Sequence, residues 1–147
     1  MDPLWELEHS VETKADLPFA WAYLSNVANW DDPPARFRLD EPFLSGSRGT
    51  TDAPGQPPRP WQLLNVKTQE GYTVQFALEG ATLSFTWRFG RLPDGGTRLG
   101  QRVSLSGDNA PAFLRDIQQV FSSNLVQGMD RIARAIDQVY AATSQPR

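Results

Sequence analysis

The chain contains no cysteine and only one histidine, His9. Without cysteine it forms no disulfide and offers no thiolate ligand to a metal ion. A single histidine also excludes the multi-histidine sites that commonly hold zinc. Asp31 and Asp32 are adjacent carboxylates, but two such groups without further oxygen ligands are a weak cation signal. We therefore expect no metal and no cofactor.

Positive charge and long apolar runs are also scarce. The net charge is −3, whereas a nucleic-acid-binding protein normally presents a basic surface to the phosphates. The longest apolar run, residues 19–24, is far too short to cross a bilayer. Residues 1–6 lack the basic and apolar regions of a signal peptide. We expect a cytoplasmic protein that neither binds nucleic acid nor inserts into membranes, and the sequence leaves its oligomeric state open.

The size and the apolar content predict one folded domain over residues 1–147. A chain of 147 residues is near the usual domain size, and 39% hydrophobic residues are enough to form a core. Eight Phe and five Trp are present, and several of them are at strand positions predicted to face inward. This placement favours a large interior over a flat binding surface.

The first sixty residues predict a strand followed by a helix pair. Residues 5–12 alternate apolar with mostly acidic side chains, as in a half-buried strand. Asp16 is placed to cap a helix over residues 17–29. The prolines that follow break the chain, and a second short helix is expected at residues 35–37. The segment 42–60 is rich in Pro and Gly and predicts an irregular strand and loop at the rim.

Two turns set the register of the later strands. Gly80-Ala81 fits a two-residue hairpin turn, which would pair Leu78 with Leu83. Residues 92–95 fit a three-residue loop with Gly95 in the left-handed conformation, which pairs Phe89 with Leu99. Both registers place the large apolar side chains on one face and polar ones on the other. A slip of one residue would invert that pattern.

The strand at residues 61–68 is harder to align. A turn at 69–71 would pair Leu64 with Phe76. That register points Trp61 outward unless a β-bulge intervenes.

A long C-terminal helix is predicted from Pro111 to about Tyr140, capped by Asp108 or Asn109. A mid-helix glycine costs close to 1 kcal/mol relative to alanine, so Gly128 indicates a kink or a reserved space. The predicted apolar stripe comprises Phe113, Ile117, Val120, Phe121, Leu125, Ile132, Ile136 and Val139, interrupted by Asn124 and Gly128.

Several segments carry a resemblance to a known family: Val11-Glu12-Thr13-Lys14-Ala15, Phe19-Ala20-Trp21, Leu24-Ser25-Asn26-Val27-Ala28-Asn29-Trp30, Gly49-Thr50 and Gly95-Gly96-Thr97-Arg98-Leu99. With the terminal helix, they resemble the START-like, or helix-grip (SRPBCC), superfamily, and within it the polyketide cyclase/dehydrase-type proteins. The resemblance implies an α+β fold. A curved antiparallel sheet of about six to seven strands would wrap around the C-terminal helix, with two short helices after strand 1.

The same resemblance implies a cavity between the sheet and the long helix. Members usually bind lipids, sterols, polyketides or other apolar molecules there, some catalyse cyclisation or dehydration, and others act as co-chaperones. The candidate ligand-binding residues on the inward faces are His9, Tyr72, Phe76, Phe85, Trp87, Phe89, Gln101, Phe121 and Asn124.

Three functions remain open at this point. The first is a binding protein for a small, mostly hydrophobic molecule, whose polar end would be oriented by His9, Gln101 and Asn124. The second is a cyclase or dehydratase in which His9, the single histidine, acts as acid or base. The third is a co-chaperone-like module that binds a protein. His9 and Gln101 also have a purely structural interpretation, as interior polar groups bonded to backbone or water.

Overall fold

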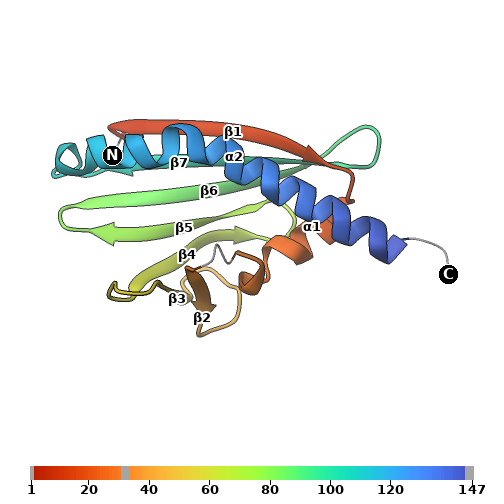
Figure 1. Ribbon diagram of the computed structural model, residues 1–147, viewed down its shortest axis with the longest axis horizontal. Helices are drawn as coiled ribbons and strands as arrows, with labels where there is room; N and C mark the ends of the chain where they lie inside the picture. Colours follow the sequence, from red (N-terminus) through yellow and green to blue (C-terminus); the bar gives the residue numbers. More distant parts are fainter. Residues whose placement is uncertain (1, 31–33, 145–147) are drawn as a thin grey trace.

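The computed structural model describes residues 2–30 and 34–144, so the predicted break at Asp31-Asp32-Pro33 lies outside the described residues. The described chain forms a seven-stranded antiparallel sheet, two α-helices and a 3-10 helix (Figure 1), which confirms the expected fold class. The strands are β1 (Trp5–Thr13), β2 (Arg36–Leu39), β3 (Arg48–Asp52), β4 (Arg59–Lys67), β5 (Gly71–Leu78), β6 (Ala81–Arg91) and β7 (Thr97–Ser106). The helices are α1 (Leu17–Leu24), the 3-10 helix η1 (Val27–Trp30) and α2 (Pro111–Ser144).

The strand order is β1-β7-β6-β5-β4-β3-β2, so β1 and β2 are the two edges of the sheet. In Figure 1, α2 lies across one face of the sheet along β1 and β7, with α1 beside its C-terminal half. The helices leave the middle strands, β5 and β6, uncovered over much of their length. Within the described residues, no helix is long and apolar enough to cross a membrane.

The first strand and the helix cap are confirmed, but the helix is shorter than predicted. Asp16 accepts a hydrogen bond from the Phe19 N–H at 2.9 Å. The helix α1 then stops at Leu24 rather than at residue 29, because the Leu24 carbonyl oxygen is bound by side chains. It accepts hydrogen bonds from Trp30 Nε1 at 2.7 Å and from the Tyr72 hydroxyl at 3.0 Å.

One prediction for residues 35–60 is wrong, and the predicted strand and loop over 42–60 are present. The expected helix at 35–37 is instead the start of β2, in which Phe37 and Leu39 are half-buried and alternate with exposed Arg36 and Arg38. In β2 a short period-two pattern determines the structure, despite the neighbouring prolines. The segment 42–60 contains the strand β3 between loops, and it also contains the beginning of β4.

The β6–β7 hairpin has the predicted register, with Phe89 opposite Leu99 and Gly95 at φ 92°. The β5–β6 register is shifted by two residues from the prediction, because Leu78 pairs with Ala81 and the loop is Glu79–Gly80. Gly80 occupies its second loop position at φ 70°, a conformation that glycine adopts without strain. Since side chains alternate with period two, the shift leaves every predicted inward face unchanged.

The β4–β5 pairing also differs from the prediction. Leu63 pairs with Val74 and Leu64 pairs with Thr73, not with Phe76, and the register shifts between Leu64 and Lys67. Asn65 lies in this bulge at φ 53°, a left-handed conformation that asparagine tolerates better than most residues. The bulge allows Trp61 to be buried on the inner face.

The long helix α2 begins at Pro111 as predicted and runs to Ser144, one turn beyond the expected end. Asn109 does not cap it; its side-chain amide donates to the Glu79 carbonyl at 2.7 Å and so ties the helix start to the β5–β6 turn. Two stripe residues were wrongly predicted to be buried: Val120 and Val139 are 49% and 41% exposed. The residues Met129 and Ala133, outside the predicted stripe, are buried instead.

The core beneath α1 is a closed cluster of aromatic rings centred on Tyr72, which is 2% exposed. Trp30 stacks on Tyr72 with ring centroids 5.7 Å apart and planes at 11°. Trp21, Phe43 and Phe89 surround it at 5.8, 5.1 and 6.1 Å. Burial raises the pKa of Tyr72 well above the usual range for tyrosine.

A partly buried polar cluster fastens the C-terminal half of α2 to the end of β1. Asp137 accepts hydrogen bonds from the Thr13 hydroxyl at 2.6 Å and from the Lys14 N–H at 2.7 Å. The Thr97 hydroxyl donates to the Ala15 carbonyl at 2.8 Å in the same region. Helix α2 is therefore hydrogen-bonded to the rest of the fold near both of its ends.

Replacing Asp137 by alanine should lower the free energy of unfolding by about 2 kcal/mol, because two hydrogen bonds to a charged acceptor are lost. Urea unfolding followed by circular dichroism measures the change. Asp130→Ala is the matched control, since Asp130 is an exposed carboxylate on the same helix, and it should change stability by less than about 0.5 kcal/mol. Equal effects of the two substitutions would contradict the anchoring role of Asp137.

Tyr72→Phe should lower stability by about 1 kcal/mol at pH 8, through loss of the hydrogen bond to Leu24. The difference should vanish between about pH 10 and 11. Unfolded tyrosine ionises near pH 10 while buried Tyr72 stays neutral, so the wild-type protein alone loses this contribution as the pH rises. Urea titrations at pH 8 and 11 test this, with Tyr23→Phe as the control. A difference that stays constant with pH would show that Tyr72 is not the group responsible.

Candidate functional site

The inner face of the sheet is divided into a closed part and an open part. Three of the candidate ligand-binding residues, Tyr72, Trp87 and Phe89, are buried in the core. They pack against one another and against residues from α1 and η1, with Tyr72 and Trp87 ring centroids 6.4 Å apart. These three side chains therefore belong to the closed part, where they support the fold.

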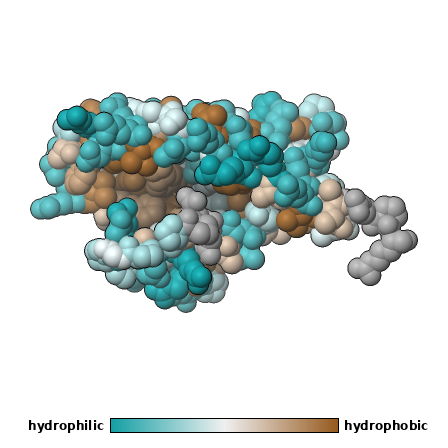
Figure 2. All heavy atoms as spheres, in the orientation of Figure 1, coloured by the Kyte–Doolittle hydropathy of each residue, from teal (hydrophilic) through white to brown (hydrophobic). Residues whose placement is uncertain are grey.

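The open part lies farther along the same strands, toward the β5–β6 turn. Phe76, Phe85 and Phe121 are only half-buried and form a chain of edge-on ring contacts. Phe76 and Phe85 are 5.7 Å apart, and Phe85 and Phe121 are 5.4 Å apart, so the contacts join β5, β6 and α2. Figure 2 shows hydrophobic atoms lining a hollow between α2 and the β2–β3 end of the sheet. Half-buried Leu83, which pairs with Phe76, is a further apolar neighbour of this region.

The polar candidates His9 and Gln101 lie next to each other on adjacent strands. Gln101 pairs with His9 on one side and with Trp87 on the other. His9, however, lines a groove of about 840 Å³ at the outer edge of β1, together with Asp130 and Ala133 of α2. The histidine is thus located at the β1 edge of α2, on the other side of the helix from the open hollow.

Asn124 and His9, which sequence analysis placed in one site, are therefore on different sides of α2. Asn124 precedes Ala133 by nine residues, about two and a half helical turns, which places the two on opposite flanks of the helix. Asn124 is exposed on the flank that borders the uncovered strands, and Gly128 follows it by about one turn on that flank.

Arg131 was missed by the sequence analysis. It follows Asn124 by seven residues, two helical turns, and so lies near the same flank of α2. A Cβ atom at Gly128 would lie 3.8 Å from the Arg131 Nη2 atom, an ordinary van der Waals contact, so the guanidinium lies along the helix beside Gly128. The i, i+3 spacing of Gly128 and Arg131 was the signal available in the sequence.

Two polar atoms on the inner surface of β3 and β4 have no hydrogen-bond partner among the described residues. They are Thr51 Oγ1 and Trp61 Nε1, both fully buried. The Trp61 ring lies against Gly49, where an added Cβ would be 2.3 Å from two ring atoms. This contact gives a physical reason for the Gly49-Thr50 motif on β3, since any larger residue would displace the tryptophan.

No protein-family model and no curated protein sequence matches this chain. Solved structures do match it over nearly its whole length. Zhui aromatase/cyclase from a Streptomyces species superposes with a TM-score of 0.71 at 18% identity, covering 97% of this chain and 99% of the other. Truncated norcoclaurine synthase from Thalictrum flavum gives 0.69 at 13% identity, covering 97% and 95%. A protein from Nitrosomonas europaea gives 0.70 at 12% identity, covering 96% and 99%.

These identities are low, and the likeness therefore concerns the backbone. The shared features are the seven-stranded antiparallel sheet, the short helix after the first strand and the long C-terminal helix. The structural neighbours are helix-grip proteins of the Bet v 1/SRPBCC type, as the sequence resemblance predicted. The chain therefore has the helix-grip fold.

Proposed function

We propose that the protein binds a small, mostly hydrophobic molecule in the hollow between the sheet and α2. The observation that carries the proposal is the half-buried row Phe76–Phe85–Phe121, which spans two strands and the helix. Apolar surface left in contact with water is unfavourable, and a ligand that covers these rings gains the free energy of their burial. The rings hold one another in edge-on contacts, so the apolar wall exists before a ligand arrives.

The division of the inner face supports the same proposal. The aromatic residues near α1 are closed off by Trp21, Trp30 and Phe43, and they offer no surface to a ligand. Figure 1 shows no helix lying over the end of β5 and β6 that leads to the β5–β6 turn. Two of the similar structures are named as an aromatase/cyclase and a norcoclaurine synthase, and these names support a small-molecule ligand here.

Binding is favoured over cyclase or dehydratase chemistry because of the position of His9. An acid or base must lie within hydrogen-bonding reach of the reacting atom. His9 lines the groove at the β1 edge with Asp130 and Ala133, whereas the half-buried phenylalanines lie toward the other flank of α2. A ligand lying on Phe76 and Phe85 is thus beyond direct contact with the histidine.

The neutral fluorescent probe N-phenyl-1-naphthylamine should bind to one saturable site. Phe85→Gln should weaken its binding about tenfold, because an amide replaces the ring at the centre of the apolar wall. The matched control is Val126→Gln, which places the same amide on an exposed position of the other flank of α2 and should leave the affinity unchanged. Probe binding that is equally weakened by both substitutions, or absent from the wild type, would count against the hollow as a binding site.

His9→Gln should change the affinity for the same probe by less than twofold, because His9 lies away from the hollow. Circular dichroism at the same temperature checks that the variant is folded. A large loss of probe affinity in the folded variant would place His9 in the ligand site and would revive its role as an acid or base.

A further inference from the structure

The charges on the inner face of the sheet have one sign. The sequence has 17 acidic and 14 basic residues, so an unbiased surface would carry more carboxylates than cations. Yet none of the inward-facing positions of the described strands holds Asp or Glu. The acidic residues of β1, for example, point outward, where Glu8 and Glu12 pair with Arg102 and Arg98 of β7. The inner face of β4 begins instead with Arg59, which is opposite Thr51 of β3.

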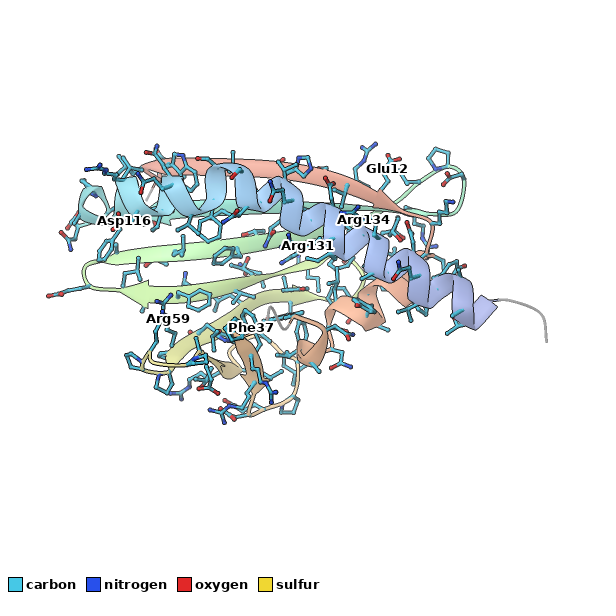
Figure 3. The ribbon with its side chains drawn as sticks, viewed as in Figure 1. Glu12, Phe37, Arg59, Asp116, Arg131 and Arg134 are labelled. Carbon is cyan, nitrogen blue, oxygen red and sulfur yellow. The ribbon has the colours of Figure 1, made fainter. Side chains whose placement is uncertain are left out.

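The flank of α2 beside the hollow also carries positive charge. Asn124, Gly128 and Arg131 follow one another on this flank, and Arg131 supplies its charge. Figure 3 shows Arg131 at the edge of α2 that borders the uncovered strands. The carboxylates of the same half of the helix, Asp130 and Asp137, line the β1-edge groove on the other flank.

Among the described residues, the Arg131 guanidinium has no ion-pair partner. The ion pairs of the described residues involve Arg38, Arg98 and Arg102, and none involves Arg131. Its side chain lies beside Gly128, close to the helix surface. An arginine in this position presents a planar group with several N–H donors, which matches a carboxylate.

We propose that the ligand is an amphipathic carboxylate: its apolar part covers the Phe76–Phe85–Phe121 row, and its carboxylate is bound by Arg131 at the mouth of the hollow. This inference rests on the function proposed above and adds the chemical class of the ligand. Asn124 supplies a second hydrogen-bond donor two helical turns before Arg131 on the same flank. The ligand's carboxylate stays at the water-exposed mouth of the hollow, so the free-energy cost of removing water from it is small.

Decanoate and 1-decanol distinguish the apolar site from the carboxylate contact at Arg131. They share the apolar chain, but decanoate ends in a carboxylate and 1-decanol in a neutral hydroxyl. Each is titrated at pH 7.5 against protein loaded with N-phenyl-1-naphthylamine, and displacement of the probe gives its affinity. A purely apolar site should prefer the alcohol, since a carboxylate is more strongly hydrated. The wild-type protein should bind decanoate at least as tightly as 1-decanol. This preference should weaken as NaCl rises from 20 to 500 mM, as an exposed ion pair requires.

Arg131→Gln should weaken decanoate binding about fivefold and leave 1-decanol within twofold. Arg134→Gln is the matched control, because Arg134 is an exposed arginine three residues later that lines the β1-edge groove (Figure 3). It should leave both affinities within twofold, and neither exposed substitution should prevent folding.

The outcomes distinguish the two claims. If 1-decanol displaces the probe but decanoate binds more weakly, or if Arg131→Gln affects both ligands equally, the carboxylate assignment is wrong and the apolar site stands. If neither compound displaces the probe and the probe itself does not bind, both claims fail. If Arg131→Gln and Arg134→Gln weaken decanoate binding equally, the attraction comes from the positive charges on the helix surface in general and not from a site at Arg131.

Discussion

The carbonyl of Leu24, at the end of α1, organises half of the inner face of the sheet. It receives hydrogen bonds from the Tyr72 hydroxyl on β5 and from Trp30 Nε1 on η1. A buried carbonyl at a helix end needs such partners, because an unsatisfied group costs about 1–3 kcal/mol. The two donors bring their rings with them, and the resulting stack with Trp21, Phe43 and Phe89 fills the space under α1. The hollow can form only in the half of the sheet that this cluster does not fill.

The position of α2 follows from its two attachments. Near its start, Asn109 binds the β5–β6 turn, and toward its end, Asp137 binds the junction of β1 and α1. Between these points the buried residues Leu125, Met129 and Ala133 pack on the sheet, while the flank with Asn124, Gly128 and Arg131 borders the uncovered strands. A helix fixed in this way forms one wall of the hollow, and Phe121 connects that wall to Phe85.

The sequence predicted strand pairing best where the residues of a turn fit only one loop register. Gly95 fits only one loop register, and the β6–β7 pairing was predicted residue by residue. Gly80, in contrast, fits either position of a two-residue loop, and the predicted β5–β6 register was off by two residues although the faces were right. The bulge at Asn65 could be named as an alternative but not located, since no neighbouring residue requires it.

The candidate site was predicted less well than the fold, for a geometric reason. Strand parity assigns a side chain to a face of the sheet, but it does not say which helix flank the side chain meets. His9, Tyr72 and Phe85 all face inward, yet their surroundings differ. His9 lies at the β1 edge, Tyr72 in the closed core and Phe85 in the hollow. These three environments depend on where α1 and α2 cross the sheet, and that crossing is set by contacts between distant residues.

Native mass spectrometry of the freshly purified protein tests the central claim most directly, because it asks whether the hollow holds a molecule. The account predicts a mass above that of the bare chain, consistent with one bound compound per protein molecule, and a compound released on denaturation that carries an apolar body and a carboxylate. The mass of the bare chain alone, both as purified and after incubation with decanoate, would contradict a ligand-binding hollow and would favour a protein partner.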